Sequence, residues 1–153
     1  MKICPRIGFT PTTPQLQTMV RVQTDDRTLI EDVTDRVAGE VPEEVETGLC
    51  TVFVPHTTAG VVLQEAESGL LADLEEFVEG LAPSDGDYRH DRIDDNADAH
   101  LRATMLGESV NIPVKDGELA LGTWQSVLFV ECDGPRTRQV EVVVTEPRGS
   151  DLD

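Results

Sequence analysis

The sequence predicts a single compact α+β domain with a mostly antiparallel sheet and two to three helices on one side. Three observations favour this class. A chain of 153 residues with 39% apolar composition can form one core. Several segments alternate apolar and polar residues, as strands do, and others repeat apolar residues at helical spacing. The domain is expected to span residues 1–153, with a core at about 16–145 and frayed tails.

The first predicted elements are a hairpin and a short helix. Residues 16–24 alternate apolar and polar side chains, and residues 27–32 are expected to pair back with them after an acidic turn. From Thr34, valines recur at helical spacing as far as Val45, and Pro42 is expected to break this helix after its second turn.

The middle of the chain combines strands with a long helix. Residues 49–55 are nearly all apolar or β-branched and predict a central strand, and residues 60–63 predict a further strand. Residues 66–81 carry an apolar stripe at helical spacing and predict an amphipathic helix, which a polar loop at 83–87 follows.

A short helix is predicted at 97–106. Asn96 is a good N-cap residue, Asp98 places negative charge in the first turn, and Gly107 fits a left-handed C-cap. His100 follows Asn96 by four residues, so both side chains are expected on one face of the helix start.

The last part of the chain reads as strands joined by turns. A Gly-containing tight turn is expected at 115–118. The predicted strands are residues 109–114, 119–121, 126–132 and 137–145.

The net charge of -18 argues against a nucleic-acid partner, because such binding depends on Lys and Arg displacing counterions. With two lysines against ten arginines, the composition resembles that of proteins from salt-loving organisms, in which molar salt screens the acidic surface. An ordinary acidic protein at moderate salt is the alternative.

A soluble, cytoplasmic protein without a membrane partner is expected. The sequence has no apolar run of membrane-spanning length, and its first residues lack the apolar region of a secretory signal. Cys4, Cys50 and Cys132 are widely spaced and odd in number, so reduced thiols are predicted.

All three histidines occupy polar, turn-adjacent positions. His56 follows a strand that is expected to be buried, where a side chain is held rigidly, as a general base or metal ligand must be. His90 and His100 lie before and within the short helix. Each alone is equally consistent with a structural hydrogen bond. Together with Glu65 and Asp98 they supply nitrogen and oxygen ligands of the kind found in zinc sites.

Two further segments are candidates for substrate contacts. Thr57 and Thr58 could offer hydroxyls and amides to a phosphate, although turn formation explains them equally well. Gln125 follows the only tryptophan, Trp124, for which burial as an aromatic plug is the simpler interpretation. The sequence has no phosphate-binding loop of the Walker type and no serine-esterase elbow.

Several motifs together resemble the YjbQ family. They occur in order over most of the chain and consist of Val-Pro-His-Thr-Thr-Ala-Gly (54–60), Tyr-Arg-His (88–90), Asp-Asn-Ala-Asp-Ala-His-Leu (95–101), Leu-Gly-Glu-Ser-Val (106–110) and Leu-Gly-Thr-Trp-Gln (121–125). The resemblance implies a compact α+β domain that assembles as a homotrimer, with the polar motif residues in a cleft near the subunit boundaries.

The resemblance also implies an activity. Family members are named secondary thiamine-phosphate synthases, because they can support the joining of hydroxymethylpyrimidine diphosphate to thiazole phosphate with release of pyrophosphate, an auxiliary activity. The positions that match the family's polar motifs are His56, Glu65, His90, Asn96, Asp98, His100 and Gln125. The chain departs from the family at 64–69, where Gln-Glu-Ala and Ser-Gly replace Asn-Glu-Asn and a helix-opening Pro.

Two hypotheses of different classes follow. The first is a transferase acting on small phosphorylated substrates, with magnesium held by Glu65 or Asp98 to neutralise the departing pyrophosphate. The second is a metal-binding trimeric module, or a metal-assisted hydrolase, in which His56, His90 and His100 hold zinc. A trimeric scaffold with structural histidines is a simpler third possibility.

Overall fold

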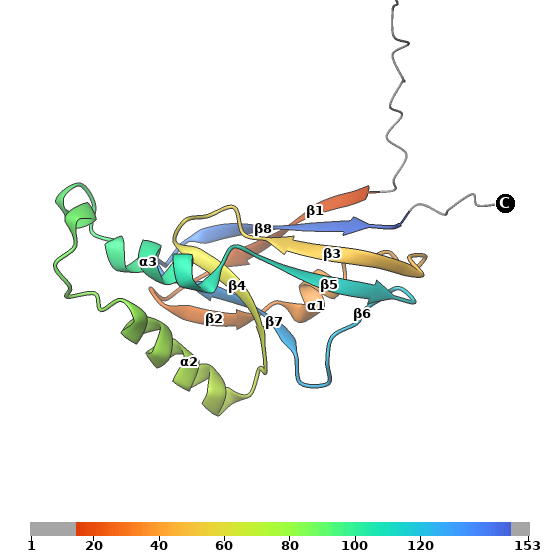
Figure 1. The fold of residues 1–153 in the computed structure, drawn as a ribbon, viewed down its shortest axis with the longest axis horizontal. Helices are drawn as coiled ribbons and strands as arrows, with labels where there is room; N and C mark the ends of the chain where they lie inside the picture. Colours follow the sequence, from red (N-terminus) through yellow and green to blue (C-terminus); the bar gives the residue numbers. More distant parts are fainter. Residues whose placement is uncertain (1–14, 148–153) are drawn as a thin grey trace, which may run out of the picture.

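Two antiparallel sheets form the framework of the computed structural model, which describes residues 15–147 (Figure 1). The larger sheet has the strand order β1-β8-β3-β5-β6 and consists of β1 (Gln15–Gln23), β3 (Thr47–Phe53), β5 (Ser109–Lys115), β6 (Glu118–Leu119) and β8 (Thr137–Thr145). The smaller sheet has the order β2-β7-β4 and consists of β2 (Leu29–Asp32), β4 (Ala59–Gln64) and β7 (Ser126–Glu131). The helices are α1 (Thr34–Ala38), α2 (Ser68–Leu81), the 3₁₀ helix η1 (Arg89–Arg92) and α3 (Ala97–Leu106).

Strand β7 is the centre of the packing, because both of its faces are buried. Val127 and Phe129 point into the core between the two sheets, which consists mainly of valines from both of them. Leu128 and Val130 point to the opposite face, where α2 and α3 cover the smaller sheet (Figure 1). The domain is therefore three layers deep, and the predicted α+β class is confirmed.

The predicted hairpin between the first two strands is wrong. Strand β1 pairs along its whole length with β8, from Gln15 opposite Thr145 to Gln23 opposite Thr137. Strand β2 instead joins the smaller sheet beside β7. The short connection between β1 and β2 crosses from one sheet to the other, and local alternation of apolar residues carries no information about the pairing partner.

Helix boundaries follow local capping chemistry. Helix α1 ends at Ala38, one turn before the proline that was expected to break it. Helix α2 begins at Ser68 because the Glu67 side chain accepts hydrogen bonds from the amides of Gly69 and Leu70, both at 2.8 Å. These bonds hold the pKa of the Glu67 carboxyl below its usual range. Helix α3 spans the predicted residues.

Other predictions are confirmed with small shifts. Strand β3 lies in the middle of the larger sheet, as predicted for a central strand. The turn before β6 has positive φ at both Asp116 (51°) and Gly117 (76°). The predicted tails and Cys4 lie outside the described residues. No helix within residues 15–147 has the length and apolar character needed to cross a bilayer.

Candidate functional site

His56 is held by the backbone of β8 just beyond the end of β3. The register that pairs Phe53 with Glu141 would place Pro55 opposite Gln139, but proline has no N–H to donate. The His56 ring takes this place: its Nε2 lies 3.1 Å from the Gln139 amide nitrogen and 3.0 Å from the Gln139 carbonyl oxygen. The backbone of β8 therefore fixes the His56 ring.

The environment of His56 favours the neutral ring. Burial lowers the pKa of His56 below its ordinary value, and the positive charge of Arg138 lowers it further, against weaker opposing effects of the Gln139 backbone and Glu131. In the neutral ring, Nε2 either accepts from the Gln139 N–H, which leaves the proton on Nδ1, or donates to the Gln139 carbonyl oxygen. In the first tautomer His56 has an N–H group, at Nδ1, to offer a ligand.

Helix α3 brings His100 to the same place. The helix lies against β4, and at Gly60 a side chain would collide with the Gly107 carbonyl oxygen, because an added Cβ would lie 2.7 Å from it. His56 and His100 both line a hollow of about 520 Å³, here called the His56 pocket. Its other lining residues are Phe53, Val54, Pro55, Thr57, Ala59, Ala103, Thr104 and Glu108.

His90 packs against His100 from the opposite side. The two ring centroids are 4.8 Å apart and the rings are nearly perpendicular, an edge-to-face arrangement. His90 and His100 also line a second hollow of about 470 Å³, here called the Tyr88 pocket. Its other lining residues are Asp87, Tyr88, Arg89, Ala97 and Leu101. Of the residues proposed for catalysis, His56, Glu65, His90 and His100, the last two thus contact each other, and His100 belongs to both pockets.

Thr58 belongs to a buried ion-pair network with Arg138 and Glu131. Its hydroxyl accepts a hydrogen bond of 2.8 Å from Arg138, which also donates to both carboxylate oxygens of Glu131 at 2.8 and 2.5 Å. Glu131 is fully buried and accepts three further bonds, from the Thr24 hydroxyl and from the amides of Cys132 and Asp133. Thr58 therefore anchors the turn after His56 rather than facing either pocket.

The protonation state of Glu131 follows from this network. Burial alone would raise the pKa of the Glu131 carboxyl, but the hydrogen bonds from Arg138 and the Asp133 amide, together with the Arg138 charge, lower it overall. The carboxylate is therefore ionised and paired. Gln139, which holds His56, directly follows Arg138 along β8, so the same short segment positions both His56 and Thr58.

The prediction that Asn96 caps α3 with its side chain is wrong. The Asn96 amide donates to Asp133 at 2.9 Å, and the first helical amide, that of Ala97, donates instead to the Asp91 carboxylate at 3.0 Å. The Asn96 side-chain oxygen Oδ1 and His90 Nε2 are two buried polar atoms without a hydrogen-bond partner among the described residues. Such atoms are rare in folded proteins, and both flank the start of α3.

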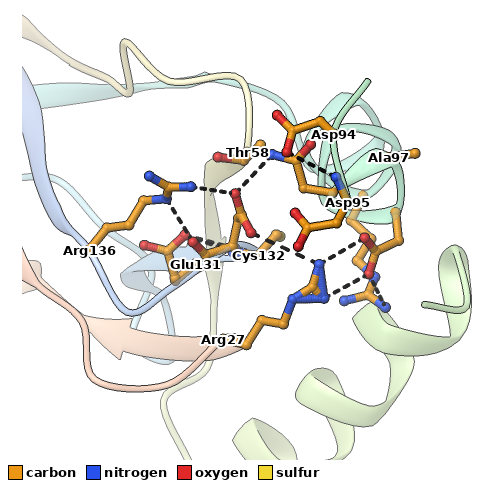
Figure 2. Close-up of polar contacts among 12 residues, drawn as sticks. Arg27, Thr58, Asp94, Asp95, Ala97, Glu131, Cys132 and Arg136 are labelled. Carbon is orange, nitrogen blue, oxygen red and sulfur yellow. Dashed lines mark hydrogen bonds and ion pairs between the residues drawn. The ribbon is translucent and has the colours of Figure 1, made fainter. Parts of the chain in front are cut away.

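Asp98 is committed to structural ion pairs. Its carboxylate is 2% exposed, accepts two bonds from Arg27 at 3.2 and 3.0 Å, and lies 3.3 Å from Arg102 (Figure 2). Arg102 in turn donates to the Ala82 carbonyl oxygen at the end of α2. Asp98 therefore joins α3 to α2 and to the segment before β2, and neither pocket includes it.

Glu65 and Gln125 lie away from the histidines within one chain. Glu65 follows Gln64 and Gln125 precedes Ser126, and Gln64 and Ser126 pair at one end of β4. The turn that carries His56 enters β4 at the other end. The six residues of β4 span about 17 Å. Gln125 closes its own turn by accepting the Gly122 amide at 2.8 Å.

Trp124, the neighbour of Gln125, is exposed, and this contradicts a second prediction from the sequence. Trp124 is 73% exposed and does not act as a buried plug, which was the simpler explanation of this residue from the sequence. Its indole therefore forms part of the molecular surface.

The donor sets proposed for a metal do not fit within one chain. Among the described residues, no three His, Cys, Asp or Glu side chains are grouped so as to hold an ion. For magnesium, the Asp98 oxygens are taken by two arginines and Glu65 lies at the far end of β4. No chemical step is therefore assigned to a metal.

Two residues of the network were missed from the sequence, although a signal was present. Arg138 occupies the same face of β8 as Val140, Val142 and Val144, all of them buried. A charged residue in phase with apolar ones predicts a buried partner of opposite charge, and Glu131 is that partner across the turn.

The fold and the pockets define a small α+β protein with two histidine-lined pockets, and comparisons identify its family. Residues 18–147 match the family described as UPF0047 protein YjbQ-like, and the chain belongs to this family. A UPF0047 protein of Archaeoglobus fulgidus is 54% identical over 79% of this chain and 94% of its own. One from Methanothermobacter thermautotrophicus is 44% identical over 80% and 87%.

Solved structures agree with this membership. The crystal structure of a YbjQ-like protein from Sulfolobus solfataricus has a TM-score of 0.85 and 36% identity, covering 88% of this chain and 99% of that one. A hypothetical protein of Aeropyrum pernix gives a TM-score of 0.83 and 42% identity over 86% and 99%.

Proposed function

We propose that this protein is a transferase of the secondary thiamine-phosphate synthase type, which joins hydroxymethylpyrimidine diphosphate to thiazole phosphate and releases pyrophosphate. The observation that carries the proposal is the His56 pocket, where a rigidly held neutral imidazole, a second imidazole and the Thr57 hydroxyl share one hollow of about 520 Å³. Such a set suits a phosphorylated ligand whose oxygens accept hydrogen bonds.

The chemistry needs no proton transfer. The bond between the pyrimidine methylene carbon and the diphosphate oxygen breaks, and its electron pair leaves with pyrophosphate. The lone pair of the thiazole nitrogen then forms the new C–N bond, and the ring becomes a thiazolium cation. Negative charge therefore grows on the leaving oxygen, where hydrogen-bond donors stabilise the transition state.

The residues of the pocket supply such donors. His56 offers Nδ1–H in the tautomer whose Nε2 accepts from Gln139, and Thr57 offers a hydroxyl, whereas the Thr104 hydroxyl donates to the His100 carbonyl oxygen at 2.8 Å. A hollow of about 520 Å³ has the size of a site for a small molecule, and the net charge of -18 disfavours a polyphosphate polymer. In this mechanism His56 acts as a hydrogen-bond donor, because its depressed pKa leaves little imidazolium at neutral pH.

The same proposal includes a homotrimer. Its support is the set of apolar side chains exposed on the single chain, above all Trp124 (73%) and Ile93 (84%). Isolated chains rarely leave such residues in water when a partner surface is available. Sedimentation equilibrium of the purified protein tests this part: a mass of about 50 kDa is expected for three chains of 16.7 kDa, and a concentration-independent monomer would refute it.

The activity is tested with purified untagged protein in high salt, with magnesium and both substrates. Thiamine phosphate is expected from the wild type, and at least about 100-fold less from His56→Ala, the effect of losing one transition-state donor. Met105→Ala is the matched control, because Met105 lines neither pocket. Equal product from wild type and His56→Ala would overturn the proposal.

A further inference from the structure

His100 is the wall that two different pockets share. On one side lies the His56 pocket, with the Thr57 hydroxyl. On the other side lies the Tyr88 pocket, whose volume of about 470 Å³ is sufficient for a small ring. Because both pockets include His100, they adjoin at this residue, and a substrate with two chemically different parts can occupy both.

The Tyr88 pocket has the walls of a ring-binding site. Tyr88, His90 and His100 contribute aromatic rings, and Ala97 and Leu101 contribute aliphatic surface. Aromatic and aliphatic walls bind flat rings through stacking and burial of apolar area. The Thr57 hydroxyl, which suits a phosphate oxygen, lines the His56 pocket instead.

The position of Tyr88 is fixed in advance. Its hydroxyl donates to the Pro83 carbonyl oxygen at 2.8 Å, and its ring lies directly against Gly86. A Cβ at Gly86 would lie 2.5 Å from the Tyr88 ring, so only glycine permits this contact. The edge-to-face contact of 4.8 Å between the His90 and His100 rings fixes a second wall. A preformed wall reduces the entropy lost on binding.

We infer that the Tyr88 pocket is a separate compartment for the uncharged aminopyrimidine ring of the diphosphate substrate, while the His56 pocket receives the phosphate groups. This inference rests on the proposed function and divides its site in two. The methylene carbon that joins ring and diphosphate then lies beside His100, the one residue that both compartments share.

Three neighbouring residues of α3 allow a matched test. Leu101 lines only the Tyr88 pocket, Thr104 lines only the His56 pocket, and Met105 lines neither. All three are exposed, so an aspartate at each position is compatible with folding. The variants Leu101→Asp, Thr104→Asp and Met105→Asp carry the same added charge on the same helix.

The probes separate ring from phosphate. Calorimetric titration in about 1 M salt, where the Debye length is about 3 Å, limits the added charge to local effects. Hydroxymethylpyrimidine, which has no phosphate, is expected to bind Leu101→Asp at least about tenfold more weakly than the wild type, and Thr104→Asp and Met105→Asp with nearly unchanged affinity. Inorganic pyrophosphate is expected to lose affinity only for Thr104→Asp.

The outcomes distinguish this inference from the proposed function. Two results would overturn the two compartments: weaker binding of the same probe by both Leu101→Asp and Thr104→Asp, or unchanged affinity of Leu101→Asp for hydroxymethylpyrimidine. In either case, product formation by the wild type would still support the activity. A wild-type protein that binds neither probe would overturn both.

Discussion

Replacement of Arg138 by methionine tests the buried network that positions the turn after His56. Methionine fills much of the same volume but leaves the Glu131 carboxylate without its cation. Because the side chains of Glu131 and Arg138 are 0% and 6% exposed, solvent cannot take over the pairing. Breaking such a buried pair destabilises a protein by about 3–5 kcal/mol.

The expected size lies in the lower half of that range. Glu131 keeps the Thr24 hydroxyl and the amides of Cys132 and Asp133, which still stabilise its charge. A loss of about 3 kcal/mol is large against a total stability of about 5–15 kcal/mol for a domain of this size. Urea unfolding at constant salt, followed by circular dichroism, measures it.

Two comparisons make the result specific. Arg136→Met removes a salt bridge of an arginine whose side chain is 51% exposed, and a loss of at most about 1 kcal/mol is expected. The double variant Arg138→Met/Glu131→Met leaves no unpaired charge and is expected to recover most of the stability. A loss for Arg138→Met no greater than that for Arg136→Met would refute the reasoning.

Three further predictions concern protonation, the Tyr88 pocket and the thiols. Nuclear magnetic resonance titration of His56 is expected to give a midpoint below 6.5 in the folded protein, so its contribution to stability is complete above about pH 6.5 and declines as the pH falls; a midpoint at or above 6.5 would contradict this. Gly86→Ala is expected to displace the Tyr88 ring and weaken binding of hydroxymethylpyrimidine. Gly80 has open space around it, so Gly80→Ala is expected to leave binding unchanged and to add about 0.5–1 kcal/mol of helix stability. Equal affinities of the two variants would contradict this prediction. Burial raises the pKa of the two described cysteines to about 11 and about 12, so neither is expected to react with iodoacetamide at pH 7 until urea unfolds the chain, as peptide mass mapping would show.

The sequence predicts those parts of the fold that depend on local chemistry. Helix α3 and strand β8 have the predicted boundaries, because apolar spacing and the flanking turn residues determine them within a few residues of chain. The partner of β1 could not be predicted in the same way. Its alternating pattern fits β2 and β8 equally well, and only the packing of the whole core selects β8.

The candidate site shows the same division. The sequence grouped the three histidines in one candidate site, and the structure places His90 against His100 and brings His100 to the pocket of His56 through the contact of α3 with β4. The roles of Asn96 and Asp98 depended on partners far along the chain, Asp133 and Arg27, which no local pattern reveals. Capping propensity therefore gave a plausible but incorrect role for Asn96.

The most direct test of the proposed function is the rate of thiamine phosphate formation by His100→Ala beside wild type and Met105→Ala, in high salt with magnesium. His100 lines both pockets, so its removal is expected to lower the rate by at least about 100-fold, while Met105→Ala keeps the wild-type rate. A His100→Ala protein that is folded and as fast as the wild type would contradict the assignment of the site to these two pockets.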